Sequence, residues 1–257
     1  MPIEIGHVEA IYRYPVKSMG GERLEIANMG WHGLDGDRRL AFRRLDDKSG
    51  FPWLTASKLP ELLLFAPQRR DDGAPGDLPT HVRTPGGKDM PVFGEDLAAE
   101  AGRRYGAPVR MTQLNHGIFD EASVSVIALD TVREIARLAG GSPDVRRFRP
   151  NLVVRLLRSV PFHEDDWVGG VLSFGEGDQA PTIAVTMRDV RCSMVNLDPG
   201  SAKRTSGRFP QGPNEPAQIL DDKFIMIQRR AKGEWRIARL MWNASGRRAL
   251  MIFHGRT

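Results

Sequence analysis

Hydrophobic and polar residues alternate at the start of the chain, as they do in a half-buried β-strand. Ile3 and Ile5 are followed by Val8, Ala10 and Tyr12, so the alternation changes phase once, which predicts a strand with one bulge. Further short apolar runs, divided by turn residues, predict strands at 39–43, 62–65, 123–128, 152–154, 171–174, 183–185 and 224–227. We therefore expect a mainly β chain with a few helices, built from barrels or curved sheets.

One segment has helical periodicity. Apolar residues between 132 and 139 fall on one face of a helix, with Asp130 expected as its N-cap. Gly140 and Gly141 are predicted to end this helix.

Two segments are rich in polar and turn residues. Residues 70–91 have loop composition around at most one short strand. A polar cluster at 112–122 marks a boundary, which predicts two domains at residues 1–115 and 116–257.

The composition is typical of a globular protein that needs no disulfide to fold. The chain has 257 residues, 40% of them hydrophobic, which is enough for one large core or two modest ones. Its single cysteine, Cys192, has no partner for an internal disulfide, which favours a reducing compartment. No signal peptide is evident, and no apolar run approaches the roughly 20 residues that span a bilayer. We therefore expect a cytoplasmic protein with no membrane span.

The net charge of +5 rests mainly on arginine, which forms bidentate contacts with phosphates and carboxylates. Arginine pairs are scattered along the chain, and no RNA-binding or recognition-helix motif accompanies them. We interpret these pairs as solvated surface and do not expect nucleic acid as a partner.

Several common functional motifs are absent, or they occur in a sequence context that does not fit the function. The six histidines are spread too widely for a local zinc site, and there is no phosphate-binding loop or serine-nucleophile turn. The run 175–180 has the spacing of a dinucleotide motif, but Pro181 follows it, so it predicts a hairpin turn. The acidic run 164–166 is interpreted as a solvated turn anchored by Trp167, with a proton shuttle as the less favoured alternative.

The segment 147–151 carries two guanidinium groups and an amide. If it is extended, Arg147, Arg149 and Asn151 share one face that suits an anion with a polar ring. The alternative is an edge strand whose arginines form ion pairs, and Pro150 fits that alternative. The spacing leaves both open.

Two earlier segments also suit an anion. Lys17 and Ser18 precede two glycines whose bare amides can approach a phosphate closely. Further along, Asp37 either orients Arg38 or caps its own turn, and capping is the favoured interpretation.

Cys192 follows Arg188 and Arg191, which would favour its thiolate if either guanidinium came close. In a regular strand Arg191 points to the opposite face from Cys192. A lone cysteine is more often a buried apolar residue than a ligand, so the pattern by itself favours a structural role.

Six motifs in order carry a resemblance to a known family. They are Tyr-Pro-Val-Lys-Ser at 14–18, Gly-Asp-Arg at 36–38, Leu-Thr-Ala at 54–56, Arg-Phe-Arg-Pro-Asn at 147–151, Glu-Asp-Asp-Trp at 164–167, and Arg-Cys at 191–192 followed by Asp198-Pro199. The chain resembles the MOSC-domain family, and most closely members with an N-terminal MOSC β-barrel region, such as the mitochondrial amidoxime-reducing component and its bacterial relatives. The resemblance implies an N-terminal β-barrel-like region at 1–115 and a MOSC-type β-barrel domain at 116–257.

The resemblance also implies a cofactor and the residues that hold it. The cofactor is the molybdenum cofactor, a molybdenum-molybdopterin compound, bound between the two regions with Cys192 as metal ligand and catalytic thiolate. The implied cofactor-binding residues are Lys17, Ser18, Arg38, Arg149 and Asn151, and from the same motifs Arg147 and Arg191.

The implied activity is that of an oxidoreductase that reduces N-hydroxylated compounds. A separate electron-transfer protein is the expected partner, because one cysteine cannot hold an iron–sulfur cluster. After residue 205 the match fades, which leaves the substrate open. The alternatives are a sulfur carrier or molybdenum-cofactor delivery protein that uses Cys192, and a binding protein without turnover.

Overall fold

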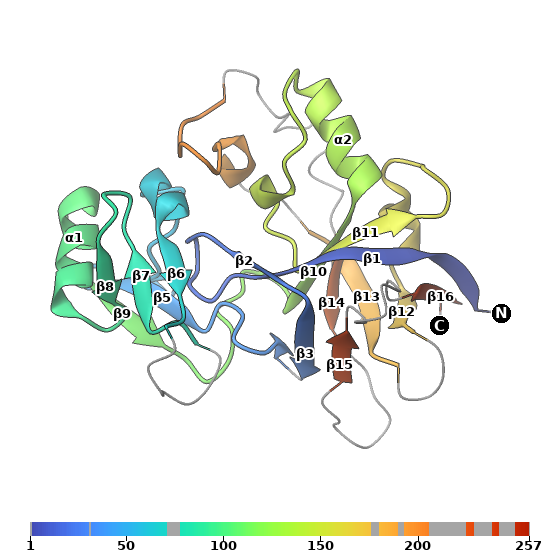
Figure 1. The fold of residues 1–257 in the computed structure, drawn as a ribbon, viewed down its shortest axis with the longest axis horizontal. Coiled ribbons are helices and arrows are strands. Elements are labelled where there is room, and N and C mark those ends of the chain that lie inside the picture. The colour runs from blue at the N-terminus through green and yellow to red at the C-terminus, as the bar shows by residue number, and fades with distance from the viewer. Residues whose placement is uncertain are drawn as a thin grey trace.

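The chain folds into two lobes (Figure 1). Both lobes are mainly β, as predicted for the chain. The structure is a computed structural model, and it describes residues 2–30, 32–70, 78–175, 180–189, 193–205, 225–228, 238–241 and 250–256.

The larger lobe is an eight-stranded sheet whose ends meet. Its strand order is β11 (Leu152–Leu156), β10 (Val124–Ala128), β14 (Ile225–Gln228), β13 (Thr182–Arg188), β12 (Gly170–Phe174), β16 (Leu250–Arg256), β1 (Ile3–Arg13) and β2 (Glu22–Leu24). β1 also pairs with β11, so the sheet closes on itself, and β2 extends from β1. The strand that opens the chain therefore lies between strands from its second half. β1 has two register shifts, one more than the single bulge predicted.

The smaller lobe combines short strands with one helix. β5 (Leu40–Arg44) pairs with β9 (Val109–Gln113), and β6 (Ala66–Gln68), β7 (His81–Arg83) and β8 (Asp89–Pro91) form a second sheet. A third sheet, of β3 (Ile26–Gly30), β4 (Gly33–Leu34) and β15 (Ala238–Met241), belongs to the larger lobe, because Ala27, Met29 and Leu34 pack into the barrel core. The segment 70–91 thus contains two short strands, one more than predicted.

α1 (Glu95–Tyr105) of the smaller lobe was not predicted. Its buried side chains are Leu97 and Ala101, one turn apart, and most of its other residues are polar or small. Such a narrow apolar stripe gives a weak periodic signal.

The predicted strand at 62–65 is wrong. Pro60–Leu64 forms a 3₁₀ helix, η1, with Pro60 in its first turn, where the fixed φ of proline suits helical geometry. Leu62 and Phe65 are buried three residues apart, which is the 3₁₀ repeat rather than the alternation of a strand.

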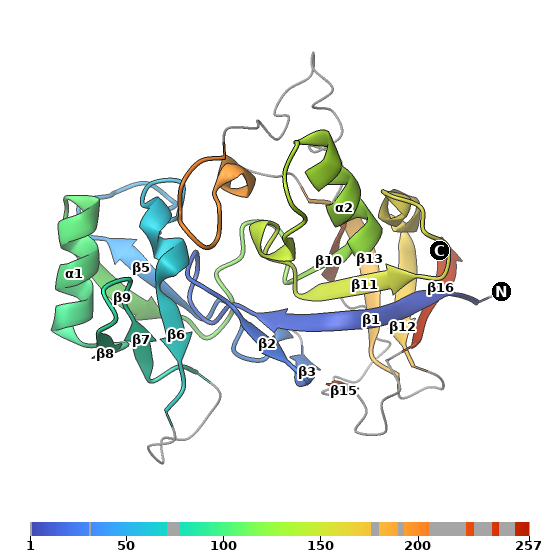
Figure 2. The same ribbon diagram turned by 45° about the horizontal axis from the view of Figure 1, so that its top comes forward.

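α2 (Leu129–Leu138) lies against β10 and β11 on the outside of the barrel (Figure 1, Figure 2). Gly140 ends it with φ +66°, as predicted, but Asp130 is in its first turn and Ala128 is the N-cap. β10 runs directly into α2 without a turn, which leaves no separate position for a capping side chain. The remaining 3₁₀ helices are η2 (Val145–Arg147), η3 (His163–Trp167) and η4 (Ser193–Asn196).

Three hydrophobic clusters hold these elements together. One fills the barrel, a second lies under α2, and a third forms the core of the smaller lobe. Both faces of β10 are buried, because Val126 points into the barrel and Ile127 packs under α2. This double burial explains the continuous apolar run in its sequence.

Glu164 in η3 is fully buried, which corrects the interpretation of the acidic run as a solvated turn at this position, whereas Asp166 is exposed. Its carboxylate accepts hydrogen bonds from the Ala128 amide and the Thr131 hydroxyl, both at 2.7 Å. Trp167 is buried as expected. Burial raises the pKa of Glu164 above its ordinary value. The carboxylate thus anchors the start of α2 through the N-cap residue Ala128, and the predicted N-cap, Asp130, lies within the helix.

Glu164→Ala should lower the free energy of unfolding by about 3 kcal/mol, because it leaves a buried amide and hydroxyl without an acceptor. Glu164→Gln should cost less, since its carbonyl still accepts from Ala128. The raised pKa means that wild-type stability falls as pH rises from the unfolded to the folded pKa of Glu164. The gap between wild type and Glu164→Gln should therefore narrow with rising pH in urea titrations. A gap that widens would contradict the assignment.

Candidate functional site

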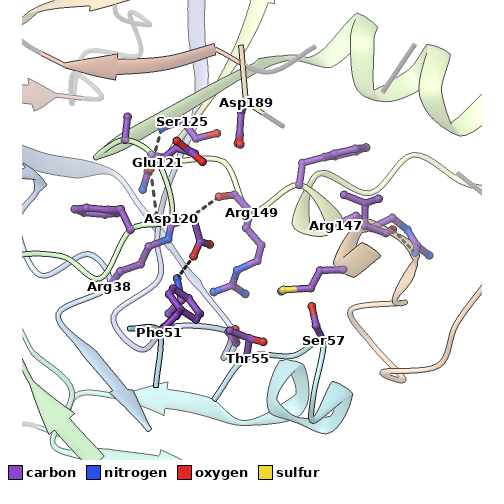
Figure 3. Close-up of a pocket in the computed structure, with 18 residues that line it drawn as sticks. Arg38, Phe51, Thr55, Ser57, Asp120, Glu121, Ser125, Arg147, Arg149 and Asp189 are labelled. Carbon is purple, nitrogen blue, oxygen red and sulfur yellow. Dashed lines mark hydrogen bonds and ion pairs between the residues drawn. The ribbon is translucent and has the colours of Figure 1, made fainter. Parts of the chain in front are cut away.

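A cavity of about 320 Å³ lies between the two lobes. Its walls come from the segment after β1, the segment after β5, the connection from β9 to β10, the η2–β11 connection and the start of η4. The lining residues are Lys17, Ser18, Arg38, Phe51, Thr55, Ser57, Phe119, Asp120, Glu121, Ala122, Ser125, Arg147, Phe148, Arg149, Asn151, Asp189, Met194 and Val195 (Figure 3).

The cavity brings together six of the predicted site residues from distant parts of the chain. They are Lys17, Ser18, Arg38, Arg147, Arg149 and Asn151. The other two, Arg191 and Cys192, lie outside the described residues.

The backbone around the cavity is in an unusual conformation. The described residues include five non-glycine residues with positive φ, and three of them, Ser18 (+66°), Arg38 (+49°) and Arg149 (+50°), line this cavity. The left-handed conformation costs an L-residue on the order of 1–3 kcal/mol, and such residues cluster at functional sites. The conformation aims these side chains where a regular strand would not.

Arg149 is the least compensated charge of the site. Its guanidinium stacks on the Tyr14 ring at 4.2 Å, and its Nη1 donates to the Met19 carbonyl at 2.6 Å. Nη2 is buried and has no hydrogen-bond partner among the described residues. No carboxylate of the described chain forms a salt bridge with it, and burial lowers its pKa to about 10. Arg149 therefore stays charged at neutral pH with one donor free for an anion.

Arg38 is held by three groups. Its guanidinium pairs with Asp37, donates to the Arg149 carbonyl at 2.9 Å and reaches the Asn151 side-chain oxygen at 3.4 Å. Asp37 also accepts from the Tyr14 amide at 2.7 Å. Asp37 thus orients Arg38, and the favoured interpretation as a cap of its own turn is wrong.

Lys17 is buried, with its ammonium turned toward the connection from β9 to β10. It donates to the Ile118 carbonyl at 3.1 Å and to the Asp120 carboxylate at 2.9 Å. Burial lowers the pKa of Lys17, and Asp120 opposes that shift. The Lys17 charge is therefore partly neutralised, unlike that of Arg149.

The first glycine after Ser18 does not offer a free amide to a phosphate as expected. The Gly20 amide donates to the Phe65 carbonyl at 2.9 Å. A side chain at Gly21 would meet the Tyr14 ring at 2.4 Å. These glycines allow close packing under the cavity.

Asn151 is a structural residue of the site. Its side-chain oxygen accepts from the Ser125 amide at 3.1 Å, and its side-chain nitrogen donates to the Tyr12 carbonyl at 3.2 Å. It therefore ties β1 to β10 beneath the cavity.

The segment 147–151 is not the extended strand considered from its spacing. Arg147 ends η2, and Arg149 is left-handed. The Arg147 side chain extends away from Arg149, toward the loop after η4 (Figure 3). Arg147 and Arg149 therefore contact different parts of the protein.

Some cavity residues were missed from the sequence. Thr55 and Ser57 face Arg149 across the cavity, and Phe51, Phe119 and Asp120 also line it (Figure 3). The Leu-Thr-Ala motif at 54–56 is the signal that could have indicated Thr55. Among the described residues, no group of three His, Cys, Asp or Glu side chains is placed to hold a metal ion.

The sequence matches two domain descriptions that together span residues 5–223. The MOSC N-terminal beta barrel domain matches residues 5–122, and the MOSC domain matches residues 112–223. The chain belongs to the MOSC-domain family. MOSC domains are associated with binding of the molybdenum cofactor.

Comparisons with individual proteins add no information on function. A search of curated proteins found no significant match. Among solved structures, the chain is similar to the YuaD protein from Bacillus subtilis, with 10% sequence identity, a TM-score of 0.44, and coverage of 98% of this chain and 96% of that chain. Within the described part of this MOSC protein, no helix is both long and apolar enough to cross a membrane.

Proposed function

We propose that this MOSC protein is an oxidoreductase that binds the molybdenum cofactor and reduces N-hydroxylated compounds with electrons from a separate redox protein. The observation that carries the proposal is Arg149, a charged residue of the cavity between the lobes, which has no carboxylate partner and whose buried Nη2 has no hydrogen-bond partner among the described residues. A phosphate-bearing ligand supplies the missing negative charge and acceptor.

The residues present fit that cofactor. Arg149, Arg38 and Lys17 would bind its phosphate and pterin, with Ser18 as a hydroxyl donor. Asn151 would hold the floor of the cavity, and Cys192 would supply the thiolate that binds molybdenum. The domain division at 115 and 116 would place the cofactor between the two parts, and the single unpaired cysteine suits the reducing cytoplasm.

When bound, the cofactor supplies a two-electron reduction in which an N–O bond is cleaved and, with two protons, the amine and water are formed. The protein's part is to orient the cofactor and to exclude bulk water from the reacting groups.

The proposal is tested by loading and activity. Protein expressed in a host that makes molybdenum cofactor is analysed for molybdenum and for fluorescent oxidised pterin. Reduction of benzamidoxime is then followed with dithionite-reduced methyl viologen as the electron source. Near-stoichiometric metal and pterin with turnover are expected, and folded protein without either would overturn the proposal.

The second candidate is a sulfur carrier or cofactor-delivery protein. It is favoured by the sequence after residue 205, which departs from the ending expected of amidoxime reducers. Persulfide on Cys192 in protein that contains no molybdenum, detected by intact-protein mass spectrometry, would support this candidate instead.

A further inference from the structure

Residues 193–205 form a loop that contributes Met194 and Val195 to the cavity wall and is held by hydrogen bonds of its own. The Thr205 amide donates to the Asn196 carbonyl at 2.9 Å, which closes the base of this loop. Asp198 accepts hydrogen bonds from both the amide and the hydroxyl of Ser201, each at 2.9 Å. A loop closed in this way can move as a unit, so its position depends on the contacts that join it to the rest of the protein.

Arg147 makes three of these contacts with one guanidinium group. Its Nη1 donates to the Leu197 carbonyl at 2.9 Å and to the Val195 carbonyl at 3.4 Å, and its Nη2 binds the Asp198 carboxylate at 3.0 Å. The side chain is 8% exposed. A guanidinium engaged in this way has its terminal nitrogens committed to the loop, in contrast to Arg149 with its free Nη2.

We infer that Arg147 is a positioning residue that latches the 193–205 loop against η2, and that it does not itself contact the ligand. Met194 and Val195 of this loop line the cavity, and the loop begins directly after Cys192 in the chain. The latch therefore fixes the part of the cavity wall that follows Cys192 in the chain. The importance of the latch for catalysis rests on the proposed function, but the latch itself is a property of the protein without cofactor.

The experiment compares Arg147→Gln with Arg146→Gln in cofactor-free protein. Arg146 is the matched control because it is exposed and its side-chain hydrogen bonds go to Asp144, although its charge also acts on Asp198 of the loop. Cys192 is the only cysteine, so the rate of reaction with a thiol reagent reports on that residue alone. Loss of the charge-assisted bonds should make the open position of the loop about tenfold more populated in Arg147→Gln. The thiol reagent should then react about tenfold faster with this variant than with the wild type. Arg146→Gln should react at the wild-type rate.

Two further variants separate positioning from general stability. Arg147→Lys keeps the ion pair with Asp198 but cannot bridge both carbonyls, so its rate should fall between wild type and Arg147→Gln. Asp198→Asn removes the charge from one of the three contacts and should have a smaller effect. Trypsin cleavage after Lys203 and Arg204 should follow the same order, because both residues lie in the loop.

Graded thiol and trypsin rates with unchanged thermal midpoints would support the latch. Wild-type rates in folded Arg147→Gln, or increases that only track a lower midpoint, would overturn it. If Arg147→Gln does not fold, the same two outcomes are read from Arg147→Lys and Asp198→Asn. The thiol and trypsin rates need no cofactor, so absence of molybdenum from the wild type would count against the proposed function and leave the latch standing.

Discussion

Arg149→Gln should retain about tenfold less molybdenum and pterin than the wild type. Among the described residues, Arg149 is the one cation of the cavity lining without a carboxylate partner, and its unpaired Nη2 is the donor that an anionic group would use. A hydrogen bond to a charged group contributes about 1.5–3 kcal/mol, and about 1.4 kcal/mol corresponds to a factor of ten in binding.

The same substitution should change the stability of the cofactor-free protein by less than about 1 kcal/mol. Glutamine loses the bond to the Met19 carbonyl and the stacking on Tyr14, but it also removes a charge that burial disfavours. A variant that loses cofactor while keeping its urea midpoint would separate ligand binding from folding.

The matched control is Arg43→Gln, which makes the same change of charge at an exposed position on β5 outside the cavity. It should retain wild-type amounts of molybdenum and pterin. Equal losses in both variants would show that only overall charge matters, and normal loading of Arg149→Gln would remove the main support for an anion at this site.

The pH dependence of phosphate binding gives an independent check. The pKa of Arg149 is lowered to about 10, so its charge is present at neutral pH and is lost as pH rises through that value. Affinity for inorganic phosphate, measured by calorimetry, should fall in that range for the wild type. Lys17 also has a lowered pKa, so only the part of the decline that disappears in Arg149→Gln reports on Arg149.

Much of the barrel could be predicted from the sequence, because buried strands leave a local signal. The run at 124–128 is apolar at nearly every position since both of its faces are covered, and its length matches one strand. η1 and α1 gave misleading or weak signals for the opposite reason. η1 has one buried side chain and α1 has two, so the positions of their hydrophobic residues carry little information about the core.

The sequence predicted which residues form the site better than it predicted how their side chains are arranged. Motif order identified six residues that the fold brings to one cavity, but it could not distinguish Arg147 from Arg149, two positions apart. Arg147 binds a loop about 50 residues further along the chain, and Arg149 stacks on Tyr14 near its start. Which guanidinium is left free is decided by these long-range partners and by the left-handed backbone at Arg149, neither of which the local spacing encodes.

Cys192→Ala should abolish reduction of N-hydroxylated compounds and leave the fold unchanged. The chain contains one cysteine, so no other residue can supply a thiolate to the metal. Removing an outer-shell partner of a metal ligand typically costs about 10–100-fold, and removing the ligand itself should cost more, to below the detection limit. Benzamidoxime reduction and molybdenum content measure the loss, while circular dichroism and the thermal midpoint check the fold.

Cys192→Ser refines this test because it keeps the size of the side chain but replaces a soft sulfur with a hard, protonated oxygen. If sulfur is the metal ligand, Cys192→Ser should be as inactive as Cys192→Ala. Both variants should still bind pterin to the extent that Arg149 and Arg38 hold the phosphate, so pterin fluorescence should fall less than molybdenum. Normal turnover by either variant would exclude Cys192 as the ligand, whereas equal loss of pterin and metal would mean that the thiolate, rather than the arginine cluster, dominates retention of the cofactor.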